Sequence, residues 1–460
     1  MEALYDKLEN RTATAAVIGL GYVGLPLALE IASAGFSVAG IDIDLKKIAT
    51  LIEGRSYIRD VPHKIIAEAV QAGRFVPTTD FSVLRKVDTV SICVPTPLSK
   101  SRDPDISFIL SATEEIRKYL HPGQLIVLES TTYPGTTDEL ILPELESSGL
   151  KVGRDFFVAF SPERIDPGNA AFNTHNTPKI VGGITEKCTT IARVFYSQFI
   201  ERVIPVSSTK CAEMVKLLEN TFRSVNIGMV NEMALMCDLL GVDIYEVIDA
   251  AATKPFGFIP FYPGPGLGGH CIPIDPHYLA WKLKALNFQA RFIGLASEIN
   301  GMMPSVVSSL VAEGLNHASK SIRGSKVLIL GVAYKKNVSD CRESPALDVM
   351  RMLSDKGAIL SYNDPLVPTL HMGSTVLKSV DLTSTNIESQ DCVVILTDHG
   401  AYDFRKIIGS SQLVIDTRNA TKGLQEFKDR IIKLGAGNNV AFASHHEEPF
   451  EAMVPTLATH

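Results

Sequence analysis

Short apolar runs alternate with helical patterns in the first part of the chain. The run TAAVIG at residues 14–19 ends at a glycine, a helical pattern follows at about 23–34, and a second apolar run occupies 37–44. Apolar runs bounded by turn residues are typical of buried strands. We predict further strands at 89–94, 125–130, 155–160 and 179–183. Strands that alternate with helices indicate a parallel, doubly wound sheet.

The pattern becomes helical after about residue 205. Residues 209–240 contain no proline and carry apolar residues at helical spacing, which predicts one long helix that ends near Gly241. The helical pattern continues to about residue 315, and a glycine- and proline-rich loop at 255–276 interrupts it.

Runs with strand character return at SKVLILG (325–331), followed by AILSYNDP, DCVVILTDH and LVIDTRN. The predicted fold class is therefore α/β: two Rossmann-like, doubly wound parallel-sheet domains joined by a helical middle domain with one long helix. We expect these domains at residues 1–206, 207–318 and 319–440, followed by a tail at 441–460.

Composition and charge exclude several classes of protein. The 460 residues are 45% apolar and 21% charged, which is typical of a globular protein and not of a disordered or fibrous one. Lysine and arginine number 44 against 51 aspartate and glutamate, a net charge of −7. This mild acidity argues against a binder of nucleic acid or of anionic membranes, which would need clustered positive charge.

The cysteines and the N-terminal residues indicate the compartment. The cysteines number seven, an odd count, and none has CxxC spacing, so we expect no disulfide framework and no metal site. The first residues, MEALYDKLENR, lack the apolar core of a signal peptide. Glycines break the uncharged run at 12–29, which favours a strand and a turn over a membrane span. We expect a cytoplasmic protein.

A GxGxxG motif, Gly19-Leu20-Gly21-Tyr22-Val23-Gly24, separates the first predicted strand from the first helix. In such a motif the glycines allow a tight turn, close approach to a pyrophosphate, and close packing of helix and strand. Asp42 lies 23 positions after Gly19, where a carboxylate can accept hydrogen bonds from an adenosine ribose and would repel a 2′-phosphate. The motif therefore predicts NAD rather than NADP, with Gly19, Gly21, Tyr22, Val23, Gly24 and Asp42 as its binding residues.

Three further segments carry candidate chemistry. Cys271 follows a run of glycines that leaves it open to a ligand, and a thiolate is a good nucleophile toward a carbonyl carbon, although a lone cysteine is commonly a small buried hydrophobe. Lys216 and Asn220 share one face of the long helix, where they form either part of a catalytic site or a solvated polar stripe. Glu163, in the segment SPER directly after a strand, is a ligand-binding acid, a cap or a surface acid.

Seven motifs occur in the order seen in the UDP-glucose/GDP-mannose dehydrogenase family, which the chain resembles from about residue 14 to 430. They are the GxGxxG turn, VPTP (94–97), STTYPGTT (130–137), SPER (161–164), AEMVKLLEN (212–220), GPGLGGHCIPIDP (264–276) and YKKNVSDCRES (334–344). Within the family, the loop around Cys271 resembles UDP-N-acetylglucosamine 6-dehydrogenases more than the UDP-glucose branch.

The resemblance implies roles for individual residues. Cys271 matches the family nucleophile, Lys216, Asn220 and Asp275 match groups that handle protons and the oxyanion, Glu163 matches the acid linked to thioester hydrolysis, and Thr131 matches the hydroxyl that holds a catalytic water. Lys47, Thr96, Ser130, Thr131 and Arg342 match residues around the dinucleotide. The residues expected to bind nucleotide sugar are Glu163, Arg164, Lys216, Asn220, Lys254, Tyr262, Gly268, Lys335 and Arg418.

The chain departs from the UDP-glucose branch at two positions. Pro167 replaces a second glutamate four residues after Glu163, so hydrolysis would depend on Glu163 alone. The loop before Cys271 is longer than in that branch, and Lys254 is the candidate substitute for its arginine. Both changes concern the phosphate clamp and the sugar, not the reaction class.

The implied reaction is an NAD-dependent, four-electron oxidation of the C6 alcohol of a UDP-sugar through a thiohemiacetal and a thioester on Cys271, for polysaccharide biosynthesis. UDP-N-acetylglucosamine is the first expected substrate, and UDP-glucose, UDP-N-acetylgalactosamine and UDP-N-acetylmannosamine are alternatives. A one-step β-hydroxyacid-type dehydrogenase and a non-catalytic nucleotide-sugar sensor are rival hypotheses. The apolar long helix, together with the family resemblance, predicts a homodimer or a higher homo-oligomer.

Overall fold

The computed structural model describes residues 1–58, 61–98, 103–165, 171–269, 271–373 and 375–437. Pro167, which replaces the second glutamate, and the predicted tail at 441–460 lie outside these residues. The chain divides into two compact units, each described by itself: Met1–Phe222 with Ile274–Ala290, and Arg223–Pro273 with the chain from Arg291 onward.

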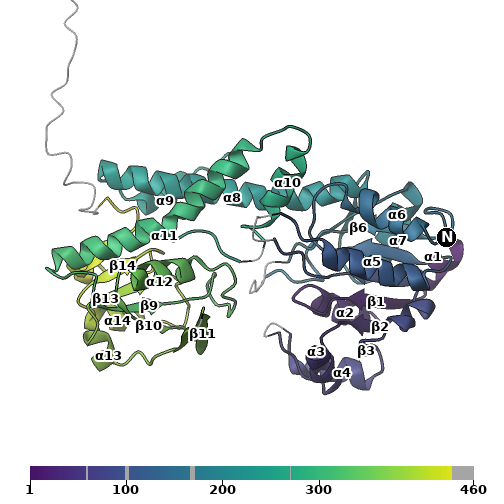
Figure 1. Ribbon diagram of the computed structural model, residues 1–460, viewed down its shortest axis with the longest axis horizontal. Coiled ribbons are helices and arrows are strands. Elements are labelled where there is room, and N and C mark those ends of the chain that lie inside the picture. The colour runs from purple at the N-terminus through teal and green to yellow at the C-terminus, as the bar shows by residue number, and fades with distance from the viewer. Residues whose placement is uncertain (59–60, 99–102, 166–170, 270, 374, 438–460) are drawn as a thin grey trace, which may run out of the picture. The chain divides into compact units, whose positions relative to one another are not determined.

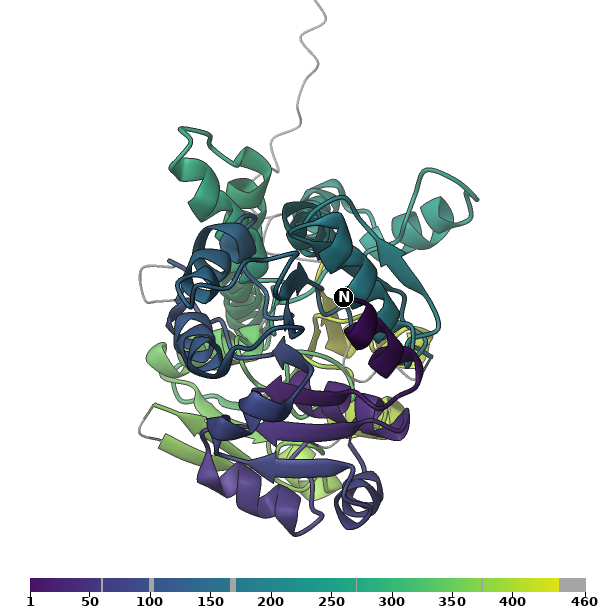
Figure 2. The ribbon, with the colours of Figure 1, turned by 90° about the vertical axis from the view of Figure 1, so that its right-hand side faces the viewer.

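The first unit contains an eight-stranded sheet in the order β3-β2-β1-β4-β5-β6-β7-β8, whose first strands are the purple arrows in Figure 2. The strands are β1 (Thr14–Ile18), β2 (Ser37–Ile41), β3 (Phe75–Thr78), β4 (Thr89–Ile92), β5 (Leu125–Leu128), β6 (Phe157–Phe160), β7 (Lys179–Gly183) and β8 (Val203–Pro205). Strands β1 to β6 pair in parallel, but β7 runs antiparallel to β6. Successive strands are added on one side of β1 as far as β3 and then on its other side from β4, so the strand order reverses at β1, where ligands bind in doubly wound sheets.

Alternation along β1 explains why helices cover both faces of this sheet. Ala15 and Val17 belong to one buried cluster, which includes residues of the N-terminal helices, whereas Ala16 and Ile18 belong to another on the opposite face. The helices of the unit are α1 (Glu2–Glu9), α2 (Gly24–Ser33), α3 (Leu45–Ile52), α4 (His63–Gln71), α5 (Ser107–Tyr119), α6 (Leu142–Glu146), α7 (Glu186–Tyr196) and α10 (Asp275–Lys284), with the short turns η1 (Phe81–Lys86) and η2 (Thr137–Ile141).

The second unit contains a five-stranded parallel sheet in the order β10-β9-β13-β14-β15 and a separate antiparallel hairpin (Figure 1). The strands are β9 (Lys326–Leu330), β10 (Ile359–Asn363), β11 (Thr369–Met372), β12 (Thr375–Lys378), β13 (Cys392–Ile395), β14 (Val414–Asp416) and β15 (Ile431–Lys433). The helices are α9 (Ile244–Ala252), α11 (Arg291–His317), α12 (Pro345–Asp355), α13 (Ser384–Glu388) and α14 (Phe404–Ser410), with the turn η3 (Gln425–Arg430).

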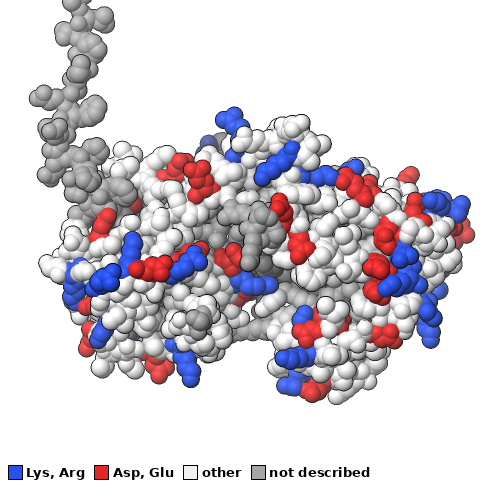
Figure 3. Space-filling view, viewed as in Figure 1, with Lys and Arg blue, Asp and Glu red and all other residues white. Residues whose placement is uncertain are grey.

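The predicted long helix is confirmed as α8 (Thr209–Leu240), and its residues are shared between the two units. With α9, α10 and α11 it forms the helical middle region of the chain, so the α/β class with a helical middle domain is confirmed. Among the described residues, every helix is too short or too polar to span a membrane. Positive and negative side chains are interspersed over the face seen in Figure 3.

Candidate active site

The glycines of the GxGxxG turn have three different surroundings. Gly19 has a φ of +91° and faces Cys93 so closely that an added Cβ would lie 2.7 Å from the Cys93 carbonyl oxygen. A Cβ on Gly24 would lie 1.9 Å from the Gly19 carbonyl oxygen, whereas a Cβ on Gly21 would meet no atom within 4 Å. Gly19 and Gly24 therefore serve the turn and the packing of α2, and Gly21 presents open backbone. This arrangement fits the pyrophosphate of a dinucleotide, and Tyr22 is exposed beside it.

Asp42 directly follows β2 and is buried beside the same turn. Its Oδ2 accepts hydrogen bonds from the Leu20 N–H at 2.9 Å and from Lys47 Nζ at 3.0 Å. Its Oδ1 accepts the Asp44 N–H at 2.9 Å. Asp42 and Lys47, which were each predicted to lie near the adenosine ribose, are therefore paired with each other in the structure.

Loops that follow β4 and β5 approach this turn at the carboxyl edge of the sheet. The Ser130 hydroxyl donates to the Val94 carbonyl at 2.7 Å, and the Tyr278 hydroxyl donates to the Thr96 carbonyl at 2.7 Å. Thr131 is half-buried next to Ser130. These contacts join the predicted dinucleotide loops to one another and to α10.

Lys216 and Asn220 are buried on α8, so the alternative of a solvated polar stripe is wrong. Lys216 Nζ donates to the Glu163 carbonyl oxygen at 2.6 Å, and Asn220 Nδ2 donates to Asp275 Oδ2. Asp275 is the first residue of α10 and is also buried. The structure thus brings four of the predicted catalytic residues together in the first unit.

Glu163 belongs to a buried ionic network that the sequence reasoning missed. Its Oε1 accepts the backbone N–H groups of Arg164 and Ile165 at 2.8 and 2.7 Å, and its Oε2 accepts Lys179 Nζ at 3.1 Å. Burial alone would raise the pKa of Glu163, but Lys179 and the backbone donors lower it below its ordinary value. Lys179 also pairs with Glu129 at 2.6 Å. The signal in the sequence was a lysine at the start of an apolar strand.

Arg164, the last residue of the SPER segment, also contacts α8. The Arg164 guanidinium forms a fork with Glu219, with Nη2 and Nε at 2.6 and 3.0 Å from Oε1, and Nη1 donates to the Pro178 carbonyl at 2.6 Å. Arg164 is therefore anchored to the helix that carries Lys216 and Asn220.

Glu213 fixes the loop that follows Thr131. Its carboxylate accepts the Gly135 N–H at 2.5 Å, the Thr137 N–H at 3.0 Å and the Thr137 hydroxyl at 2.7 Å. Burial raises the pKa of Glu213 to about 7, while these three hydrogen bonds act in the opposite direction. Glu213 was not predicted as a site residue, although it lies one helical turn before Lys216.

The Cys271 loop lies in the second unit, tightly packed on the segment after β9. A Cβ on Gly268 would lie 2.6 Å from Tyr334 Cβ, and the Gly269 N–H donates to the Arg342 carbonyl at 3.1 Å. Cys271 follows these glycines and is half-buried. The structure thus joins the Cys271 loop to the turn that carries Lys335 and Arg342.

Arg418 approaches the same loop from the end of β14. Its Nη1 would lie 2.5 Å from a Cβ on Gly264, and its Nε donates to the Leu396 carbonyl at 2.9 Å. Two other predicted substrate residues are engaged elsewhere in this unit. Lys254 lies over the Phe256 ring at 4.9 Å, and the Tyr262 hydroxyl donates to Asp249 at 3.1 Å.

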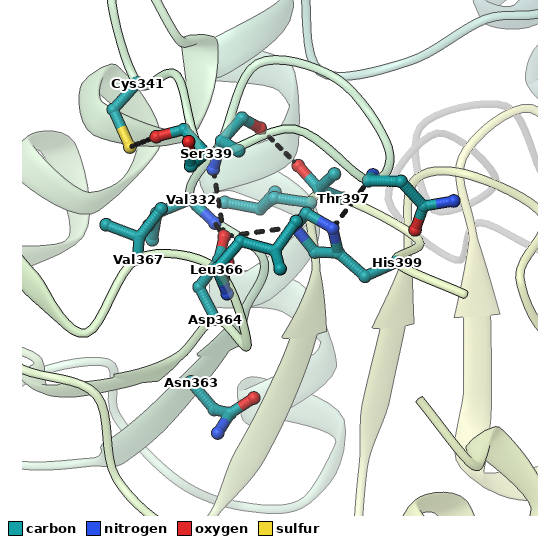
Figure 4. Close-up of polar contacts among 12 residues, drawn as sticks. Val332, Ser339, Cys341, Asn363, Asp364, Leu366, Val367, Thr397 and His399 are labelled. Carbon is teal, nitrogen blue, oxygen red and sulfur yellow. Dashed lines mark hydrogen bonds and ion pairs between the residues drawn. The ribbon is translucent and has the colours of Figure 1, made fainter. Parts of the chain in front are cut away.

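The turn that carries Lys335 is held by a buried pair, Asp364 and His399, whose side chains point toward each other in Figure 4. Asp364 Oδ2 accepts the N–H groups of Val332 and Ala333 at 2.8 and 3.1 Å and lies 3.1 Å from His399 Nε2. His399 Nδ1 accepts the Asn337 N–H at 3.0 Å, so the ring hydrogen is assigned to Nε2, which donates to Asp364. The pair therefore fixes both ends of the turn.

A glycine turn and a buried carboxylate at the switch point of the first sheet, in a unit that also buries a lysine and an asparagine on α8, are typical of a nucleotide-dependent enzyme. The chain belongs to the UDP-glucose/GDP-mannose dehydrogenase family. Its residues 13–200 match the NAD binding domain of that family, 210–302 the central domain and 328–423 the UDP binding domain. The predicted family and cofactor are thereby confirmed, and the protein is an NAD-dependent oxidoreductase.

Curated relatives and solved structures agree with this membership. A UDP-N-acetyl-D-mannosamine dehydrogenase of Pyrococcus horikoshii is 35% identical over 88% of this chain and 96% of its own length. A UDP-N-acetyl-D-glucosamine 6-dehydrogenase of Pseudomonas aeruginosa is 34% identical over 84% of this chain and 88% of its own length. The structure of a UDP-D-ManNAc dehydrogenase from P. horikoshii has a TM-score of 0.84 at 34% identity and covers 92% of this chain and 99% of that one.

Proposed function

We propose that the chain oxidises the C6 primary alcohol of an N-acetylated UDP-hexosamine to the carboxylate, with two NAD⁺ consumed per sugar. The observation that carries this proposal is the buried group on α8, where Lys216 contacts the segment of Glu163 and Asn220 contacts Asp275. A buried cation next to hydrogen-bond donors and carboxylates suits a reaction that develops charge on an alcohol oxygen.

The sugar is the finer part of the proposal. The sequence resemblance alone favours UDP-N-acetylglucosamine, and one relative carries that name. Several relatives of equal similarity are named for UDP-N-acetyl-D-mannosamine. We therefore place UDP-N-acetylmannosamine first, UDP-N-acetylglucosamine second, and UDP-N-acetylgalactosamine and UDP-glucose behind them.

In the proposed reaction, Lys216 and Asn220 stabilise the alkoxide that forms when the C6 alcohol loses its proton, and Asp275, directly or through water, accepts that proton. Bound NAD⁺ supplies the hydride acceptor for each oxidation. The Cys271 thiolate adds to the resulting aldehyde to give a thiohemiacetal, and a second hydride loss gives a thioester. Water, held by Thr131 and deprotonated by Glu163, then attacks the thioester carbon, and the Cys271 thiolate leaves.

Binding is divided among the remaining predicted residues. For the cofactor, we assign Gly19, Gly21, Tyr22, Val23, Gly24, Asp42, Lys47, Thr96, Ser130 and Thr131, and Arg342 as a further contact. For the UDP-sugar, we assign Arg164, Gly268, Lys335 and Arg418, with Lys254 and Tyr262 as outer contacts. We place these functions in domains at residues 1–206, 207–318 and 319–440.

We also propose a homodimer built on α8. Apolar side chains stay exposed along this helix, among them Leu218, Met229, Leu239 and Leu240 at 61, 51, 60 and 74%. A second copy that covers them would remove this surface from water. Because the seven cysteines form no disulfide, a reducing compartment such as the cytosol is the proposed location.

A panel of the four UDP-sugars with NAD⁺ tests the proposal. NADH is followed by absorbance and the product by mass spectrometry. We expect two NADH per sugar consumed, a uronate product without free aldehyde, and a higher kcat/KM for the N-acetylated sugars, by about 10- to 200-fold over UDP-glucose. One NADH per sugar would indicate a one-step dehydrogenase, and binding without NADH would indicate a sensor. Either result would overturn the proposed function.

A further inference from the structure

Three charged side chains are buried together at the carboxyl edge of the first sheet, and the proposed reaction uses only one of them. Glu129, Lys179 and Glu163 are 1, 5 and 8% exposed. Lys179 Nζ lies 2.6 Å from Glu129 Oε2 and 3.1 Å from Glu163 Oε2. One ammonium is therefore shared between two carboxylates in a site with little access to water.

The antiparallel direction of β7 explains how Lys179 reaches Glu163. Ala159 pairs with Gly183 and Phe160 with Gly182, so each step forward along β6 is one step back along β7. Three further steps from Phe160 place Glu163 opposite Lys179, the first residue of β7. In a parallel pair, the beginning of one strand lies at the opposite edge of the sheet from the end of its neighbour. The reversal of β7 thus delivers a cation to the edge where Glu163 lies.

Within the described part of the chain, Lys179 is the one cation that forms an ion pair with Glu129. The second oxygen of Glu129 accepts the Tyr196 hydroxyl at 2.6 Å, and the Tyr196 ring lies 5.4 Å from Lys179 Nζ. Cys93 is buried nearby, and burial, with the charge of Glu129, raises the pKa of its thiol well above the ordinary value, so it is neutral. Lys216 is a further charge near Glu163, and its Nζ donates to the Glu163 carbonyl oxygen.

We propose that Lys179 is a positioning residue that holds the Glu163 carboxylate in place for thioester hydrolysis, and that Glu129 sets the strength of this hold by sharing the ammonium. The role rests on the proposed function, in which Glu163 removes a proton from the attacking water. Removal of Lys179 leaves two buried carboxylates side by side, and buried like charges force one of them to take a proton. When the Glu129 charge is removed, the Lys179 ammonium forms an ion pair with Glu163 alone.

The two substitutions consequently have opposite signs. Lys179→Met raises the pKa of Glu163, so a higher pH is needed to ionise Glu163 and reach the same hydrolysis rate. Glu129→Gln lowers it, so hydrolysis persists to a lower pH. Opposite charges at this distance change a carboxyl pKa by about 1–3 units, which sets the expected displacement of the acidic limb for Lys179→Met. Lys179→Arg keeps the charge and should restore most of the profile.

The test measures kcat against pH with NAD⁺ and the preferred UDP-sugar, together with the intact mass of acid-quenched enzyme, which reports thioester on Cys271. In Lys179→Met we expect thioester to accumulate and the acidic limb to move to higher pH, with single-turnover NADH formation nearly unchanged. In Glu129→Gln the limb should move to lower pH. Lys187→Met, the same change at an exposed position of α7, is the matched control.

The proposal is overturned if Lys179→Met neither accumulates thioester nor moves the acidic limb, or if Glu129→Gln moves it in the same direction as Lys179→Met. If Lys179→Met does not fold, Glu129→Gln, which keeps the Lys179 ammonium, tests the proposal by the direction in which the acidic limb of its kcat–pH profile moves. Failure of the proposed function is separate: wild type then forms no NADH with any UDP-sugar, or Glu163→Gln accumulates no thioester.

Discussion

Alanine substitutions at two glycines of one motif should have opposite effects on stability and on cofactor binding. At Gly21 an added methyl meets no atom within 4 Å, so the fold accepts it. The substitution reduces the conformational freedom of the unfolded chain and should raise the free energy of unfolding by about 0.4–1 kcal/mol. At Gly24 the methyl would lie 1.9 Å from the Gly19 carbonyl oxygen and 3.0 Å from Cys93 Cβ. Backbone must then move, at a cost of about 1–3 kcal/mol or more.

Gly21→Ala, the substitution that the fold accepts, should be the one that weakens NAD⁺ binding directly. The space that a Gly21→Ala methyl fills is where the backbone would approach the pyrophosphate, so a hydrogen bond to a charged group is lost, worth about 1.5–3 kcal/mol. That loss corresponds to a roughly 10- to 100-fold weaker NAD⁺ affinity. In thermal melts, Gly21→Ala should match or exceed wild type without NAD⁺ and gain much less stability on its addition, whereas Gly24→Ala should melt several degrees lower.

Gly301→Ala on α11 is the control, because a Cβ there also meets no atom within 4 Å and the position is remote in the chain from the motif. It should leave the NAD⁺ affinity unchanged. If Gly21→Ala destabilised the protein and kept normal affinity for NAD⁺, the assignment of open, ligand-facing backbone to Gly21 would be wrong.

Four further predictions concern the reaction, assembly and pH. Cys271→Ser should lose steady-state turnover by orders of magnitude but keep some of the first oxidation, whereas Lys216→Ala should lose single-turnover NADH formation as well. Near-normal turnover of Cys271→Ser, with two NADH per product, would show that Cys271 is not the nucleophile. Light scattering should give about twice 50.0 kDa, and Leu239→Glu should shift the mass toward the monomer; a wild-type monomer at micromolar concentration would contradict the dimer. The pKa of Glu213 is raised from 4.5 to about 7, so between these pH values the folded state binds more protons than the unfolded state. The free energy of unfolding should therefore fall as pH rises through this window, by at most about 3 kcal/mol. In denaturant titrations, Glu213→Gln should lack this pH dependence. His399→Ala should raise the KM for UDP-sugar more than it lowers single-turnover NADH, because it frees the turn with Lys335, and an unchanged KM would contradict that role.

The sequence predicted the elements whose side chains follow a clear period. The long helix, Thr209–Leu240, has the predicted bounds because an unbroken helical pattern without proline ends before Gly241. The strands at the centre of both sheets lie within the predicted runs, since strands buried on both faces are continuously apolar. The edge strands β3, β8 and β15, the hairpin β11–β12 and the N-terminal α1 were not predicted, because their short or mixed patterns resemble loops.

The candidate site was predictable where a motif carries it, and less so where partners meet through the fold. Gly19, Asp42 and Lys216 were found from local spacing or from family resemblance. Lys179 escaped because its pairing with Glu163 follows from an antiparallel register, and the interpretation of a uniformly parallel sheet was wrong at β7. The segment between β6 and β7 contains no described helix, whereas the crossover between parallel strands is usually helical.

The two α/β domains end their second strands with the same residue type but leave it with different hydrogen-bonding capacity. Asp42 accepts three hydrogen bonds, and a carboxylate has about four acceptor sites, so one is left for a ribose hydroxyl. Asp364 accepts four hydrogen bonds, from Val332, Ala333 and His399 on Oδ2 and from Leu366 on Oδ1, and its side chain is 0% exposed, so a ligand has no access to it. In the repeated architecture, one carboxylate is proposed to bind the cofactor ribose, and the other forms hydrogen bonds only within its own domain. The expected stoichiometry is one NAD⁺ per chain, even at saturating cofactor.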